Sequence, residues 1–213
     1  MCLLPLLGGG CQTVSPVPAR ADLSTPKSAA LSYLRAVQYQ DVKTARAVSI
    51  GTLEEKSWID SLCTMLDGMR RYDAALTAKF GHVTNQIHVD LWESIRGLAD
   101  QPVELIAEGQ ESGDGQQARI DPPRRGFKSH SQGSIYLRKD PQGWKVDLAQ
   151  TYAKDVPPDQ LETISAGFLQ TRLFGQVFQK TARDVQSGQF KSMKEATKAL
   201  AERLAEVHQT EAE

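Results

Sequence analysis

The sequence has few of the features that mark metal sites, nucleic-acid surfaces or membrane spans. It contains three cysteines and four histidines, and neither a CxxC nor an HxxxH spacing occurs, so we predict no metal site and no cofactor. The formal net charge is −1, which gives no electrostatic reason to expect nucleic acid as a partner. No apolar run approaches the ~20 residues that a transmembrane helix needs.

What is present is the composition of an ordinary globular chain. The 213 residues are 40% hydrophobic and 24% charged, enough to bury a real core in one domain with additions, or at most in two small domains. Cys63 stands alone inside a helical apolar pattern. We therefore predict that it is a small buried apolar side chain rather than a reactive thiol.

The N-terminal segment carries a targeting pattern. Residues 2–10 read CLLPLLGGG and precede Cys11, which resembles a bacterial lipoprotein signal. In that family the peptidase cuts before the cysteine, and the cysteine is lipidated. The resemblance implies a lipid on Cys11 that holds the protein to a membrane of the bacterial cell envelope, facing the periplasm or the exterior. The alternatives are plain secretion and an apolar start without a targeting role. We read residues 1–25 as the signal and a flexible, proline-containing tether.

Helical signals follow the tether. Thr25 and Pro26 suit an N-cap and a first helical position, and a second short helix is predicted to end at Gly51. A capping box at residues 52–55 opens a long helix that ends at Gly81. Its apolar stripe consists of Trp58, Leu62, Met65, Met69, Tyr72, Leu76 and Phe80, spaced as on one helix face.

The middle of the chain favours strands. Residues 103–108, VELIAE, are predicted to form one strand, and residues 116–121, QQARID, the returning strand after a glycine-containing turn. The stretch IYLRKDPQGWKVDL, residues 135–148, predicts a second hairpin with Asp140 facing Gly143. Alternation then places Ile135, Leu137, Trp144, Val146 and Leu148 on the core face, and Tyr136, Arg138, Lys145 and Asp147 on the other.

The position of Asp147 argues against a catalytic role. A general acid or base needs burial or a like charge to bring its pKa near neutrality. In the predicted register, Asp147 shares a face with Arg138 and Lys145, whose positive charges act in the opposite direction. We therefore interpret this carboxylate as part of a solvated face with charge pairs between strands.

The C-terminal part, residues 151–213, predicts a helical hairpin. One helix is expected over residues 159–187, and a second carries a narrow apolar seam from Phe190 to Val207 across a turn at residues 187–189. This seam suits packing within the protein. The alternative is that residues 159–208 dock a partner.

The order of these elements resembles one superfamily. TPKSAALSYLRAVQYQDVKTARAV and IYLRKDPQGWKVDL are similar to the first helices and the last hairpin of the nuclear transport factor two-like, or SnoaL-like (cystatin-cone), superfamily. The resemblance covers about residues 25–150. It implies an α+β fold for residues 26–150, with a curved antiparallel sheet packed on N-terminal helices like a cone that can hold a small apolar ligand. Enzymatic members place an Asp or His inside the cone, and we can map no such residue here.

These observations lead to a predicted function. We expect a non-enzymatic, envelope-tethered domain that binds a small apolar ligand or another envelope protein, in an oligomeric state that the sequence leaves open. Four large amphipathic side chains could line a pocket, with ordinary core packing as the alternative: Tyr33, Trp58, Tyr72 and Trp144. Two other functions stay open. One is an isomerase or cyclase that uses a buried acid such as Asp121 or Asp147, or a His, and the other is interaction through residues 159–208.

Overall fold

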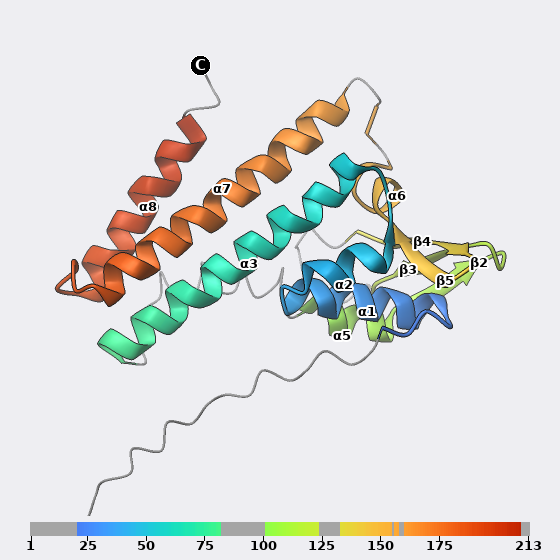
Figure 1. Ribbon diagram of the computed structural model, residues 1–213, viewed down its shortest axis with the longest axis horizontal. Helices are drawn as coiled ribbons and strands as arrows, with labels where there is room; N and C mark the ends of the chain where they lie inside the picture. Colours follow the sequence, from blue (N-terminus) through green and yellow to red (C-terminus); the bar gives the residue numbers. More distant parts are fainter. Residues whose placement is uncertain (1–20, 82–100, 124–132, 155, 158–159, 210–213) are drawn as a thin grey trace, which may run out of the picture.

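The computed structural model describes residues 21–81, 101–123, 133–154, 156–157 and 160–209. The protein is an α+β fold in which a curved, unclosed sheet packs on short helices, while three long helices lie side by side and extend away from it (Figure 1). The helices are α1 (Pro26–Gln38), α2 (Val42–Ala47), α3 (Leu53–Phe80), α5 (Gln101–Glu108), α6 (Leu148–Ala153), α7 (Leu161–Gln186) and α8 (Met193–Gln209).

The sheet has five strands in the order β1-β5-β4-β3-β2. They are β1 (Ser49–Ile50), β2 (Gln110–Gly113), β3 (Gln117–Asp121), β4 (Ile135–Asp140) and β5 (Gly143–Asp147). Neighbouring strands are antiparallel, except that β1 runs parallel to β5. Strand β1 has only two residues, too few to show an alternation of polar and apolar side chains. The prediction of a helix that continues to Gly51 is therefore wrong for residues 49–50.

The predicted hairpin register is confirmed. Asp140 faces Gly143, Lys139 faces Trp144 and Leu137 faces Val146. The inner face of the sheet carries the predicted apolar residues, and the indole of Trp144 lies in the core at 6% exposure. We call the opposite face, which carries Gln117, Arg119, Tyr136, Arg138, Lys145 and Asp147, the outer face.

One predicted strand pair is wrong. Residues 103–108 lie within helix α5, and the strand that pairs with β3 is β2. The helix buries Ile106, and the ammonium of Lys27 on α1 donates to the carbonyl of Gly109 just after it at 2.9 Å. All four residues of β2 are exposed, so this edge strand lacks the apolar alternation by which a strand is recognised.

Capping explains where the N-terminal helices begin. Thr25 and Thr52 each form a capping box, and Asp41 caps α2 by accepting from the backbone of Thr44 at 3.0 Å. The break between α1 and α2 passes through Gln40, whose φ of 57° lies in the left-handed region. The predicted helix starts at Pro26 and after Thr52 are therefore confirmed, as is the end of α3 before Gly81.

The C-terminal helical hairpin is present and packs along α3. Trp58 stacks on Phe168, and Tyr72 meets Phe178 in a T-shaped, edge-to-face contact, so α3 and α7 run in the same direction. The two helices come very close at Gly68 and Gly175: a Cβ on Gly68 would lie 2.2 Å from the carbonyl oxygen of Gly175. Helix α8 closes the layer by burying Ala196 and Leu200.

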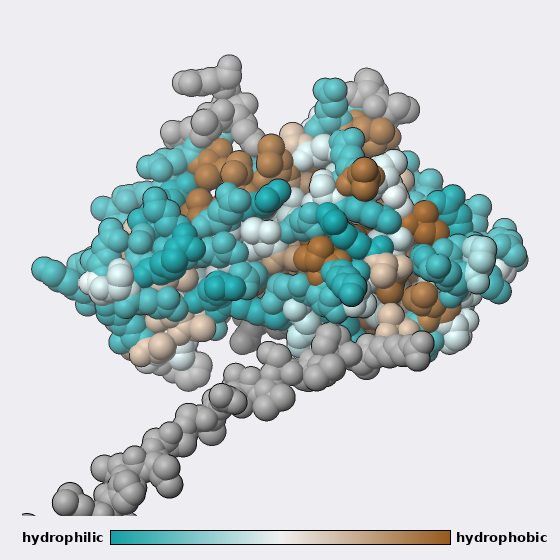
Figure 2. Space-filling view, viewed as in Figure 1, coloured by the Kyte–Doolittle hydropathy of each residue, from teal (hydrophilic) through white to brown (hydrophobic). Residues whose placement is uncertain are grey.

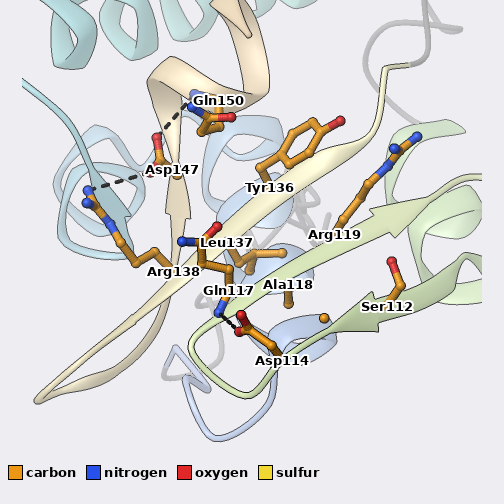
Figure 3. A pocket seen from close by; sticks show the side chains of 11 residues that line it. Ser112, Asp114, Gln117, Ala118, Arg119, Tyr136, Leu137, Arg138, Asp147 and Gln150 are labelled. Atoms are coloured by element: carbon orange, nitrogen blue, oxygen red, sulfur yellow. Dashed lines mark hydrogen bonds and ion pairs between the residues drawn. The ribbon is translucent and has the colours of Figure 1, made fainter.

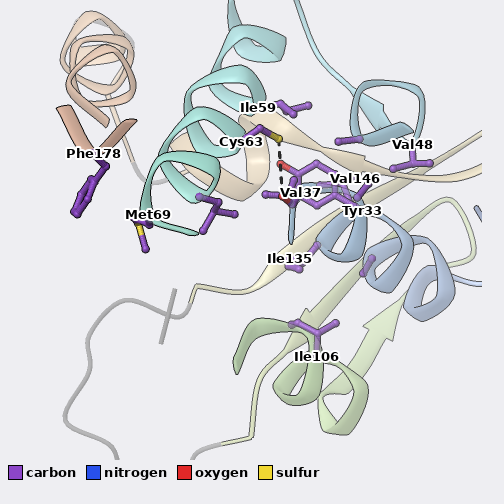
Figure 4. Close-up of a cluster of buried hydrophobic side chains, with 14 of the residues drawn as sticks. Tyr33, Val37, Val48, Ile59, Cys63, Met69, Ile106, Ile135, Val146 and Phe178 are labelled. Atoms are coloured by element: carbon purple, nitrogen blue, oxygen red, sulfur yellow. Dashed lines mark hydrogen bonds between the residues drawn. The ribbon is translucent and has the colours of Figure 1, made fainter. Parts of the chain in front are cut away.

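One continuous core joins the sheet and the long helices. Figure 4 shows Tyr33 and Val37 of α1, Cys63 of α3 and Val146 of β5 close together in one buried cluster, which also includes Phe178 of α7. The C-terminal hairpin therefore shares its apolar surface with the rest of the fold through α3.

Candidate functional site

The outer face of the sheet carries an open hollow of about 440 Å³ between the β2–β3 turn and the start of α6 (Figure 3). Most of its lining side chains are polar. They are Ser112, Asp114, Gln117, Arg119, Tyr136, Arg138, Asp147 and Gln150, together with Gly113, Ala118 and Leu137. Because the side chains of Ala118 and Leu137 are buried on the inner side, these two residues offer mainly their backbone to the hollow.

Asp147 and Arg138 form one wall of the hollow. The Arg138 guanidinium lies 3.5 Å from Oδ2 of Asp147, and Oδ1 of the same carboxylate accepts from the backbone N–H of Gln150 at 3.1 Å. Asp147 is the N-cap of α6, which explains why strand β5 stops here and the predicted strand position of Leu148 is instead the first residue of a helix. The carboxylate is thus held in place by a helix start and by a cation.

Tyr136 and two cations form another part of the site. The Lys154 ammonium donates to the Tyr136 hydroxyl at 2.9 Å and lies 4.4 Å from the ring centroid, while the Arg119 guanidinium lies 5.6 Å from it. Arg119 also pairs with Asp121 at 2.7 Å. The side chains of Arg119 and Arg138 point toward opposite ends of the hollow in Figure 3.

Asp114 closes the end of the hollow at the β2–β3 turn. Its Oδ1 accepts the backbone N–H groups of Gln116 and Gln117 at 2.9 and 2.8 Å. These bonds stabilise the charged form, so the pKa of Asp114 is lowered from its ordinary value. The carboxylate therefore shapes the turn.

A second hollow, of about 650 Å³, lies beside the β4–β5 turn. It is lined by Ala21, Leu23, Ser24 and residues 139–143. The carbonyl of Leu23 accepts from the backbone N–H of Trp144 at 2.9 Å, so the described chain enters the fold along β5. Nearby, the Lys145 ammonium lies 2.8 Å from Asp140, and this hydrogen bond lowers the Asp140 pKa.

The four aromatic residues predicted as pocket lining lie in the core. Tyr33, Trp58, Tyr72 and Trp144 are all buried, and none lines the hollow on the outer face. Trp58 meets Tyr152 in a T-shaped, edge-to-face contact, and the Tyr152 hydroxyl lies 2.9 Å from that of Tyr33. Tyr152 thus joins Trp58 and Tyr33 in one aromatic cluster.

Burial controls the chemistry of this cluster. It raises the pKa of the Tyr33 hydroxyl well above its usual range and that of the Cys63 thiol to about 12. Cys63 is free and buried, which confirms its interpretation as a small apolar side chain. A thiol that keeps its proton at neutral pH is a poor nucleophile.

Cys11, the predicted lipidation site, lies outside the described residues. Three of the four histidines, His82, His88 and His130, also lie outside them. His208 is exposed on α8, with Nδ1 2.9 Å from the side-chain amide of Gln170. Within the described ranges, no group of three or more His, Cys, Asp or Glu side chains could hold a metal ion.

None of the helices in the described part of the chain is long and apolar enough to cross a bilayer.

The sequence predicted some of the residues that line the hollow and missed others. Sequence alternation predicted that Tyr136, Arg138 and Asp147 share the outer face, and the pairing of Arg138 with Lys145 confirms the register. The sequence did not predict the contributions of Ser112 and Gln150. Ser112 lies on an exposed edge strand, and Gln150 lies on helix α6, of which only the first residue, Leu148, was assigned to a predicted strand. The alternation of QQARID was the signal that could have placed Gln117 and Arg119 on the same face.

No family model, curated protein or solved structure matches this chain.

Proposed function

We propose that the protein is a non-enzymatic binding domain, tethered to the bacterial cell envelope by a lipid on Cys11, whose binding site is the hollow on the outer face. The observation that carries the proposal is the contrast between the two faces of the sheet. The large aromatic side chains are used in core packing on the inner side, whereas the open concavity is lined by charged and amide side chains.

The carboxylates of the outer face support a binding role over a catalytic one. Asp147 caps a helix and pairs with Arg138, and Asp121 pairs with Arg119. A general acid or base must present its carboxylate to the substrate, whereas these two carboxylates already hold a helix start and two guanidinium groups. An isomerase or cyclase would need an acid with a different environment.

The lining also indicates the kind of ligand. Arginine, glutamine, serine and carboxylate groups supply hydrogen bonds in a space of the size that small ligands occupy, about 300–1,000 Å³ in general. The geometry therefore favours a polar small molecule, or a polar segment of another envelope protein, over the apolar ligand implied by the family resemblance.

Helix-mediated interaction is a second candidate, favoured by exposed apolar side chains on α7. Leu161 is 42% exposed and Leu169 is 53% exposed. Figure 2 shows apolar side chains gathered where the N-terminal half of α7 faces the C-terminal half of α8. Such a surface would suit a partner helix.

Photo-crosslinking in the native host tests the proposed site. A photoreactive amino acid at Gln117 should label a ligand or partner, and the same group at Lys194 on α8 should not. Substituting Arg138→Glu should abolish the Gln117 product. Equal labelling from both positions, or none from Gln117, would refute the site.

The tether has its own test. Mass spectrometry of the mature protein should find an acylated N-terminal Cys11, and an unmodified Met1 would remove the anchor.

A further inference from the structure

We propose that the hollow binds the acidic group of a small ligand, a carboxylate or a phosphate, through Arg138, and that Asp147 competes internally for the same guanidinium. This inference rests on the proposed function, because it names the ligand class of the proposed site.

The pairing of Arg138 is loose compared with the other arginine pairs of the fold. Its guanidinium lies 3.5 Å from Asp147 and its side chain is 52% exposed. Arg203 and Arg71 lie 2.7 Å from their carboxylates. A guanidinium has five N–H donors in a planar fork, and Asp147 is the one partner of Arg138 among the described residues. Most of its donors can therefore serve a ligand.

Asp147 is fixed in a position from which it cannot shorten its 3.5 Å distance to the Arg138 guanidinium. Its side chain is 15% exposed, and Oδ1 is engaged at the start of α6 by the backbone of Gln150. The arginine side chain, by contrast, is long and mostly in solvent. Rotation toward the hollow would exchange one long ion pair for a bidentate pair with a ligand carboxylate or phosphate, which is the stronger geometry.

The rest of the lining suits a small ligand with further polar groups. Gln117 faces Arg138 across the β3–β4 pair, and Gln150 lies beside Asp147 (Figure 3). Their amides can donate and accept without adding charge. The Lys154 ammonium, which donates to the Tyr136 hydroxyl, adds positive charge to the outer face.

Two formal charges of each sign line the hollow: Arg119 and Arg138 against Asp114 and Asp147. The negative charges already have partners, Asp114 in the turn and Asp147 at the helix start. Arg119 is engaged by Asp121. Of the four charged side chains that line the hollow, Arg138 thus has the weakest ion pair. A negatively charged ligand would therefore form its most favourable interaction with Arg138.

Isothermal titration calorimetry of the full chain, with small probes that differ in charge, tests this inference. The probes are succinate, its uncharged diamide, and inorganic phosphate, each at low salt because screening weakens exposed pairs. Wild type should bind succinate or phosphate and not the diamide. Arg138→Gln should weaken binding by about tenfold, which corresponds to about 1.4 kcal/mol. Arg172→Gln, which removes an exposed arginine of α7, is the matched control and should leave affinity unchanged.

Asp147→Asn gives the sharper outcome, because it should tighten binding. Asparagine caps helices as well as aspartate does, so α6 should be retained, while the competing charge is lost. Circular dichroism checks that each variant is folded. Weaker binding in Asp147→Asn, an unchanged affinity in Arg138→Gln, or no binding of either acid by wild type and Asp147→Asn would each overturn the inference. A Gln117 crosslink combined with any of these results would leave the proposed function standing and reject only the acidic ligand.

Discussion

The close approach of α3 and α7 makes Gly175 the position where the smallest change should have the largest effect. A Cβ at Gly175 would lie 2.6 Å from the carbonyl carbon and oxygen of Thr64 and 2.7 Å from the backbone nitrogen of Met65. All three are backbone atoms, so no side chain can rotate away. The helices would have to separate, which would loosen the stack of Trp58 on Phe168.

Gly167 is the matched control on the same helix. It is exposed, and nothing lies within 4 Å of a Cβ built there. Gly167→Ala should therefore stabilise the protein by about 1 kcal/mol through helix propensity alone. In Gly175→Ala the same gain is opposed by overpacking, which costs about 3 kcal/mol where backbones collide. The expected net destabilisation is about 2 kcal/mol, and the two variants should differ by about 3 kcal/mol.

Urea denaturation followed by far-ultraviolet circular dichroism measures this difference. With a slope of about 2 kcal/mol per molar urea, Gly167→Ala should raise the midpoint by about 0.5 M and Gly175→Ala should lower it by about 1 M. A Gly175→Ala midpoint equal to or above that of Gly167→Ala would refute the close packing of α3 on α7.

Three further predictions concern side chains. Cys63 should react with a thiol reagent only after unfolding, because it is buried and its pKa is raised to about 12, and fast reaction of the folded protein would contradict this. Arg203→Met should lower the free energy of unfolding by about 2 kcal/mol, since the Arg203 guanidinium lies 2.7 Å from Asp184. The control Lys198→Ala, at an exposed position, should change the free energy of unfolding by less than about 0.5 kcal/mol. Equal effects of the two substitutions in urea titrations would argue against a stabilising Arg203–Asp184 ion pair. The hydrogen bond from Lys145 lowers the pKa of Asp140 in the folded state, so its contribution is present above the unfolded pKa of about 3.9 and is lost as the pH falls through the lower folded value. Asp140→Asn should therefore reduce the loss of thermal stability below about pH 4, and an unchanged acid transition would contradict this.

Much of the fold could be predicted from local patterns. Thr52 and Glu55 form the predicted capping box, and the alternation from Ile135 to Val146 predicted both the register and the buried face of the hairpin. These signals are local because a cap joins residues three apart and a tight turn sets its own pairing. The edge strand β2 and the two-residue β1 escaped prediction because neither has an apolar face of its own.

The candidate site was predicted only in part. Alternation placed Arg138 and Asp147 together on the outer face, but the same pattern could not show that Asp147 caps a helix. The pocket prediction for Trp58 and Tyr72 named aromatic residues whose burial proved to be core packing against α7. Helical spacing identifies a buried face but does not say whether a cavity or another helix covers it.

The sequence by itself determined the helix starts, the long apolar stripe of α3 and the two-faced hairpin, because each depends on neighbours a few positions apart. Only the tertiary structure decided that Gly68 meets Gly175, that α7 fills the space beside the aromatic side chains, and that β3, β4 and α6 together line an open polar hollow. The physical reason is that these contacts join segments far apart in the chain, where packing and close backbone approach select the partner and no local pattern records it.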